Sequence, residues 1–149
     1  MSQLATFSVH GLALGVDVLE VQEILRDQSL TRVPLACEDV AGLINLRGQI
    51  VPALSLEKLL RLPSGGTEPA RVSLVVTSAA GPISLQADDV GDVIEVTPDT
   101  FELPPRNLDA AVRDLIDGVH KLDGQLLLVL NIGRVLETQA SEGKARSER

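Results

Sequence analysis

The chain of 149 residues carries a formal net charge of −8, so its average surface would repel a nucleic-acid backbone or an anionic lipid surface. Its apolar runs are far shorter than the roughly 20 residues that a membrane-spanning helix needs. We therefore expect a soluble, cytoplasmic protein that binds no nucleic acid and does not insert into a membrane. Phe7 and Phe101 are its only aromatic residues, so the core must be built from Val, Leu and Ile.

Short strands dominate the pattern, because Gly and Pro divide the sequence into brief segments and no helical periodicity extends beyond about ten residues. The first departure is Asp17–Glu20, whose spacing is typical of a capping box. It predicts a brief helix that carries Val18, Val21 and Leu25 inward. A strand that continues through the same residues is the alternative interpretation.

The most informative feature is an internal repeat, in which residues 42–60 recur as residues 118–136 at an offset of 76. Six positions are identical in the two copies: Gly42, Leu46, Gly48, Gln49, Leu54 and Leu60 match Gly118, Leu122, Gly124, Gln125, Leu130 and Leu136. Self-similarity at a fixed offset indicates a tandem of two related structural units.

Each unit reads as a strand, a tight turn, a returning strand and one short helix. The turns, Arg47–Gly48 and Asp123–Gly124, contain the glycine that a type I′ hairpin turn favours. Ser55 and Asn131 then occupy equivalent positions suited to a helix N-cap. The residues after both caps follow the spacing of one buried helical face. They are Leu56, Leu59 and Leu60 in the first copy, and Ile132, Val135 and Leu136 in the second.

A half-chain of about 70 residues with short strands suits a small closed barrel, because closure removes exposed sheet edges. The prediction is a mainly β fold with two small barrels packed side by side, at approximately 12–62 and 70–131. An exchange of terminal segments between the barrels stays open. Both lie in a domain over 1–137, and the polar residues 138–149 are expected to form a disordered tail.

Two motifs are more specific than the rest of the sequence: Gly15–Ile24 follows the pattern G-V-D-x-x-x-V-Q-E-I, and Gly42–Pro52 follows G-x-x-N-L-R-G-x-I-V-P. In combination they resemble the CheW family of chemotaxis adaptors. Ile83–Val93 and Leu127–Ile132 resemble later strands of the family, so the likeness covers roughly residues 6–136. The chain departs from the family pattern at Val33–Val40, which lacks the usual aromatic residue.

The resemblance implies SH3-like five-stranded barrels and a non-enzymatic adaptor in a chemosensory array beneath the membrane. Its expected partners are the cytoplasmic tip of a chemoreceptor, which docks in the groove between the barrels, and the regulatory domain of a CheA-type histidine kinase. No cofactor, metal or catalytic residue is implied. Carried over by motif position, the receptor-facing residues are Val21, Glu23, Gly42, Arg47 and Val90.

The residues alone give Arg47 two interpretations. A turn arginine is by default a solvated charge, yet the matching turn carries Asp123, so the fold itself does not demand a cation there. A rival function is a small-molecule-binding or hydrolytic barrel that uses the groove as a pocket, with Cys37 or an acidic residue as its reactive group. His10 and His120 have no carboxylate partner that spacing identifies, so they do not form an expected catalytic pair.

Overall fold

The computed structural model describes residues 2–27, 30–31, 40–62, 72–122 and 124–137. The strands are β1 (Ser2–Val9), β2 (Leu12–Asp17), β3 (Val21–Arg26), β4 (Val40–Leu46), β5 (Gln49–Ser55), β6 (Val72–Val76), β7 (Ile83–Ala87), β8 (Asp89–Val96), β9 (Phe101–Glu102), β10 (Ile116–Leu122) and β11 (Gln125–Leu130). The helices are η1 (Val18–Glu20), α1 (Leu56–Leu59), η2 (Pro98–Thr100), α2 (Ala110–Arg113) and a segment over 132–137. No helix in these ranges is long and apolar enough to span a membrane.

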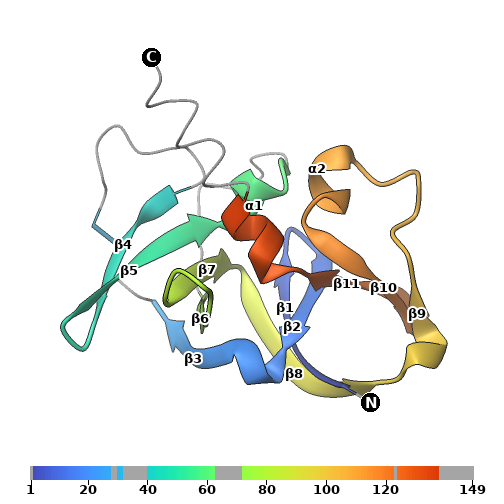
Figure 1. The fold of residues 1–149 in the computed structure, drawn as a ribbon, viewed down its shortest axis with the longest axis horizontal. Coiled ribbons are helices and arrows are strands. Elements are labelled where there is room, and N and C mark those ends of the chain that lie inside the picture. Colours follow the sequence, from blue (N-terminus) through green and yellow to red (C-terminus); the bar gives the residue numbers. More distant parts are fainter. Residues whose placement is uncertain (1, 28–29, 32–39, 63–71, 123, 138–149) are drawn as a thin grey trace.

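The strands form two curled sheets that lie side by side (Figure 1). We call the sheet with the order β3-β6-β7-β5-β4 barrel 1, and the sheet with the order β8-β1-β2-β11-β10-β9 barrel 2. In barrel 2 the short β9 follows β8 after one turn of η2. One bent segment of the chain therefore supplies both outer strands of this sheet. The predicted fold class, two small barrels with short helices, is confirmed.

Each barrel is brought to closure by backbone pairing between elements at its margins. In barrel 1, the chain beyond β3 returns to β4, where Thr31 and Leu43 exchange two hydrogen bonds of 2.9 and 2.8 Å. In barrel 2, β9 pairs with β10 through Phe101 opposite His120. These pairings occupy part of the outer edges of both sheets.

The sequence repeat corresponds to a structural repeat. β4 and β10 begin and end 76 residues apart, and so do the starts of β5 and β11. Both hairpins shift register at the same place, between Val40 and Gly42 and between Ile116 and Gly118. Arg47 and Gly48 have the positive φ values of +53° and +88° that the predicted type I′ turn requires. Residue 123 lies outside the described residues.

The barrels exchange their first hairpins. In barrel 1, β5 runs parallel to β7 with Ala53 opposite Ser84, and in barrel 2, β11 runs parallel to β2 with Val129 opposite Gly15. Ala53 and Val129 are 76 residues apart, so the hairpins β6–β7 and β1–β2 correspond. Each barrel therefore contains strands from both halves of the chain. The predicted barrel ranges 12–62 and 70–131 therefore do not coincide with the two sheets, because β6 and β7 pair in barrel 1 while β1 and β2 pair in barrel 2.

One aliphatic core lies between the two sheets. It includes Leu74 and Leu85 from barrel 1 and Leu14 and Leu128 from barrel 2, all at most 2% exposed. The short helices cover it through their predicted faces: Leu56, Leu59, Leu60, Ile132 and Val135 are buried in the same cluster. The caps are formed as predicted, with Ser55 Oγ accepting from the Lys58 N–H at 3.3 Å and Asn131 Oδ1 accepting from the Arg134 N–H at 3.1 Å.

The predicted helix with inward Val18, Val21 and Leu25 is wrong beyond its first turn. Asp17 caps η1, its carboxylate accepting from the Leu19 N–H at 2.9 Å. The helix ends at Glu20, and from Val21 the chain is strand β3, paired with β6. The alternative interpretation, a strand, holds there because pairing with a buried neighbouring strand outweighs a local helix-start signal.

Candidate functional site

Four of the five predicted receptor-facing residues lie in barrel 1. Val21 and Glu23 are on β3, Gly42 is on β4, and Arg47 is in the turn between β4 and β5. Val90 is on β8 of barrel 2. β3 and β4 are the two outer strands of barrel 1, so residues from these strands meet only because the sheet curls.

Arg47 and Glu23 form a two-pronged ion pair across this closure. Arg47 Nη1 donates to Glu23 Oε2 at 2.9 Å, and Nη2 donates to Oε1 at 2.6 Å. The Arg47 side chain is 74% exposed and that of Glu23 26%, so water screens the pair and its contribution to stability is at most about 1 kcal/mol. Its main effect is to hold the guanidinium in a fixed position on an accessible surface.

Gly42 has a structural reason to be glycine. A Cβ at this position would lie 2.7 Å from the backbone oxygen of Thr31. The same contact occurs at the equivalent Gly118, where a Cβ would lie 2.5 Å from the backbone oxygen of Glu102 and against the ring of Phe101. In both barrels the glycine lets the closing segment cross directly over the strand, so Gly42 shapes this surface through its backbone.

Val21 and Val90 occupy matching positions in the two barrels. Val21 pairs with Val76 and Val90 pairs with Phe7, and each pairing is followed by a bulge in the outer strand. Both valines are half-buried and pack against the core between the sheets. Each barrel therefore has one valine at the margin where that core reaches the surface.

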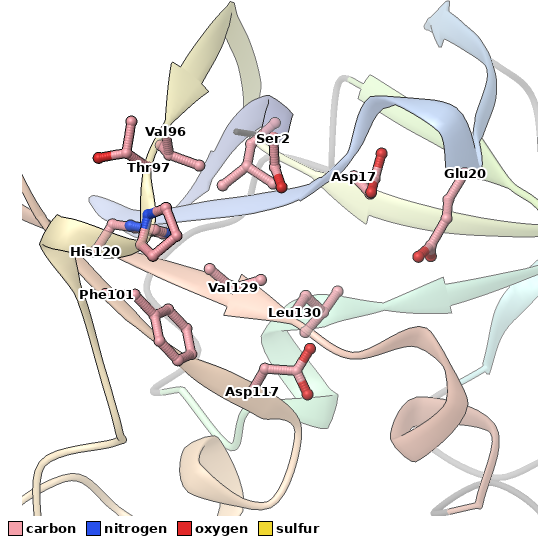
Figure 2. Close-up of a pocket in the computed structure, with 12 residues that line it drawn as sticks. Ser2, Asp17, Glu20, Val96, Thr97, Phe101, Asp117, His120, Val129 and Leu130 are labelled. Atoms are coloured by element: carbon pink, nitrogen blue, oxygen red, sulfur yellow. The ribbon is translucent and has the colours of Figure 1, made fainter.

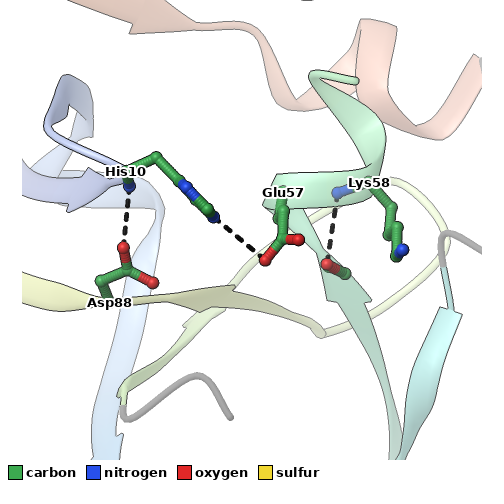
Figure 3. A network of polar contacts seen from close by, with 5 residues as sticks. His10, Glu57, Lys58 and Asp88 are labelled. Atoms are coloured by element: carbon green, nitrogen blue, oxygen red, sulfur yellow. Dashed lines mark hydrogen bonds and ion pairs between the residues drawn. The ribbon is translucent and has the colours of Figure 1, made fainter. Parts of the chain in front are cut away.

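Polar contacts on another part of the surface join the barrels (Figure 3). His10, in the β1–β2 turn of barrel 2, lies 3.1 Å through Nε2 from a carboxylate oxygen of Glu57 on α1. Its backbone N–H donates to Asp88 at 2.7 Å, just before β8. Sequence spacing identified no partner for His10, because Glu57 is 47 residues away and meets it only after the hairpin exchange.

A cavity of about 470 Å³ opens in barrel 2 (Figure 2). Its lining includes the apolar side chains of Leu4, Val96 and Phe101. Toward one end stand three carboxylates, Asp17, Glu20 and Asp117, and toward the other the imidazole of His120. The cavity could not be predicted from the sequence, because its lining comes from both ends of the chain.

The titratable groups of the cavity respond to their surroundings. Burial raises the pKa of the Glu20 carboxyl above its ordinary value, and the neighbouring carboxylates of Asp17 and Asp117 raise it further. Burial lowers the pKa of His120, which favours the neutral imidazole at physiological pH. His120 Nδ1 lies 2.8 Å from the hydroxyl of Thr100, and the Phe101 ring centroid is 5.3 Å from that of His120.

The two histidines are not brought together within the described part of the chain. His10 and His120 belong to separate networks, one with Glu57 and the other with Thr100. No three His, Cys, Asp or Glu residues in the described ranges are placed to hold a metal ion. The rival hypothesis named Cys37 or an acidic residue as the reactive group: Cys37 lies outside the described residues, and the acidic residues Asp17, Glu20 and Asp117 line the cavity of barrel 2.

Comparison with known proteins extends over both barrels. The CheW-like domain family model matches residues 3–140. The chemotaxis protein CheW of Bacillus subtilis is 28% identical over 141 residues, which cover 94% of this chain and 90% of the relative. The protein FrzA of Myxococcus xanthus is 28% identical over 142 residues, covering 94% of this chain and 88% of the relative.

The fold agrees with a solved relative. The crystal structure of the scaffolding protein TtCheW from Thermoanaerobacter tengcongensis superposes with a TM-score of 0.77 at 27% sequence identity, covering 87% of this chain and 88% of that one. The resemblance first indicated by the motifs around Glu23 and Arg47 is thereby confirmed. The chain belongs to the CheW-like domain family.

Proposed function

We propose that this chain is a non-enzymatic adaptor that couples chemoreceptors to a CheA-type histidine kinase. The observation that carries the proposal is the family match over residues 3–140, which includes both barrels. The similarity to a solved protein described as a scaffold supports the same role. An adaptor acts by binding its partners through its surface, and each partner needs a surface of its own.

The receptor-binding surface in this proposal is centred on Arg47. Its guanidinium is oriented by Glu23 yet remains accessible, an arrangement suited to charge-assisted hydrogen bonds with a partner. The half-buried Val21 and Val90 supply apolar contact at the margin of the core. Gly42 contributes indirectly, by holding the β4 backbone against the Thr31 segment.

Separate surfaces would serve the kinase regulatory domain. Barrel 1 exposes Ile50 at 58% and Ile24 at 41%, and barrel 2 exposes Leu103 at 78% and Val93 at 53%. Apolar side chains of this size at the surface are a common feature of protein interfaces. Their presence on both barrels fits an adaptor that contacts kinase domains on two sides, as in an alternating ring.

Gel filtration tests the proposal directly. The full chain is mixed with a kinase regulatory domain, alone and together with a receptor cytoplasmic fragment, and co-elution is measured. We expect a complex with each partner. Co-elution with neither partner would contradict the adaptor function.

The Arg47→Glu variant tests the receptor surface. Reversing an exposed charge should leave the fold intact, while repulsion from Glu23 and loss of the donor group should weaken receptor binding about tenfold or more. Binding to the kinase domain should be unchanged. Arg106→Glu is a matched control, because Arg106 is also exposed and lies away from this ion pair. Equal receptor affinity of Arg47→Glu and the control would remove Arg47 from the site.

A further inference from the structure

The cavity in barrel 2 is best understood by comparison with the same place in barrel 1. By the correspondence of the two repeats, Asp17 matches Gln86, Asp117 matches Ala41 and His120 matches Ile44. Barrel 1 is neutral at these positions. The fold therefore does not require two carboxylates and an imidazole there, and their presence in barrel 2 calls for another explanation.

Barrel 1 also satisfies its own polar groups at this place. Gln86 is 6% exposed and donates from Nε2 to the hydroxyls of Ser73 at 2.8 Å and Ser84 at 2.9 Å. These partners fill the interior and complete a closed network. Barrel 2 instead has Leu4 and Gly15 at the corresponding positions, so it keeps an open space of about 470 Å³.

The negative charge in that space is only partly matched. Asp17 accepts from the Leu19 N–H at 2.9 Å, and Asp117 accepts from Asn131 Nδ2 at 2.7 Å. Among the described residues, the Glu20 carboxylate has no hydrogen-bond or ion-pair partner, and no Lys or Arg is part of the described cavity lining. Three carboxylates around one cavity favour an occupant that brings a positive charge.

His120 adds a polar group to the wall of the cavity. It is 6% exposed and lines the cavity. Its Nδ1 contacts Thr100, while Nε2 has no hydrogen-bond partner within the described ranges. Nε2 is not among the described side-chain atoms that are both fully buried and without a partner, so it is accessible and can offer a hydrogen bond to an occupant of the cavity.

We propose that this cavity receives an arginine side chain presented by a protein partner. The aliphatic stem would lie along Leu4 and Val96, and the planar guanidinium would reach the carboxylate end, where its five donors can be shared among several oxygens. The ring of Phe101 offers a face for stacking. The volume falls in the range of about 300–1,000 Å³ that is usual for ligand sites.

The inference rests on the proposed adaptor function, since it names the chemistry of one contact with a protein partner. The site is separate from the Glu23–Arg47 pair, which lies on barrel 1. Receptor or kinase binding can therefore succeed even if the cavity binds no arginine. The two proposals can fail independently.

The test is an NMR titration of the full chain with the peptide acetyl-Gly-Arg-Gly-amide. The chain has only two His and two Phe residues, so the ring signals of His120 and Phe101 can be followed individually. We expect saturable shifts of both, while the signals of His10 and Phe7 stay in place. The citrulline peptide, which has the same shape without the charge, should bind at least about fivefold more weakly.

A pair of variants tests the site itself. Glu20→Gln removes one cavity charge with little change of shape and should weaken the arginine peptide about fivefold. Glu95→Gln removes the same charge from an exposed position outside the cavity and should leave binding unchanged. Absence of saturable shifts, equal binding of the citrulline peptide, or equal binding of a lysine peptide would overturn the proposal.

Discussion

Barrel 1 and barrel 2 have the same strand plan but different contents. Barrel 1 holds a buried neutral network around Gln86, and its exposed charge is placed outside, in the ion pair of Arg47 with Glu23. Barrel 2 has an open cavity with carboxylates inside, and its turn at the position of Arg47 carries Asp123. Because the two repeats share one backbone plan, a residue type that both barrels keep is attributed to folding. A residue type that differs at matching positions is not required by the fold and can serve partner binding.

The same comparison identifies what both copies retain. Gly42 and Gly118 allow the closing segment to cross each barrel, and Ser55 and Asn131 cap the helix that covers the core. These shared features are requirements of the fold.

The largest expected effect comes from the core between the sheets. Leu85 on β7 is fully buried there, so Leu85→Ala should lower the free energy of unfolding by about 2–5 kcal/mol in urea denaturation. Because both barrels share this core, hydrogen exchange should show that their strands lose protection together. Leu126→Ala, at a position 42% exposed, is the control and should cost much less. Protection lost in barrel 1 alone would show that the barrels unfold independently.

An intermediate effect is expected at the two crossing glycines. Gly42→Ala and Gly118→Ala each place a methyl group within 2.7 Å of a backbone oxygen, and the resulting overpacking should cost about 1–3 kcal/mol each. Gly15→Ala is the matched control, since its Cβ would lie 3.4 Å from the Leu4 side chain, an ordinary contact. Unfolding midpoints in urea provide the measurement. If one glycine tolerates alanine and the other does not, the two closures are not equivalent.

The smallest effect concerns His120 and pH. Burial lowers its pKa in the folded state below the ordinary 6.5, so the folded protein disfavours the protonated form. The contribution of neutral His120 to the free energy of unfolding is fully present above pH 6.5. This contribution is lost as the pH falls below 6.5. His120→Ile copies barrel 1 at this position and should reduce the decline of the urea midpoint between about pH 7 and pH 5.5. Identical slopes for the two proteins would show that His120 does not contribute to acid sensitivity.

Local features of the repeat could be predicted from the sequence because they depend on neighbouring residues. The positive φ values at Arg47 and Gly48 follow from turn chemistry, and the caps at Ser55 and Asn131 follow from side-chain oxygens placed before an apolar helical face. The same local logic misassigned residues 21–25. Their capping-box start is real but lasts one turn, after which pairing with β6 decides the conformation.

Features that depend on distant residues were not predictable in this way. The contact of Arg47 with Glu23 spans 24 residues, and that of His10 with Glu57 spans 47. Which hairpin enters which barrel is decided by pairing across the whole chain. The cavity combines Leu4 and Val129, so it becomes visible only when both ends of the chain are in place.

The exchange of hairpins also determines when this protein can fold during its synthesis. Barrel 1 needs β6 and β7, so it stays incomplete until residue 87 has left the ribosome. The β1–β2 hairpin, made first, waits for β11 at residues 125–130 before its parallel neighbour exists. Such long-range pairing slows folding and prolongs the exposure of unpaired strands. A nascent chain halted after its first half would present two incomplete sheets, each a substrate for a chaperone.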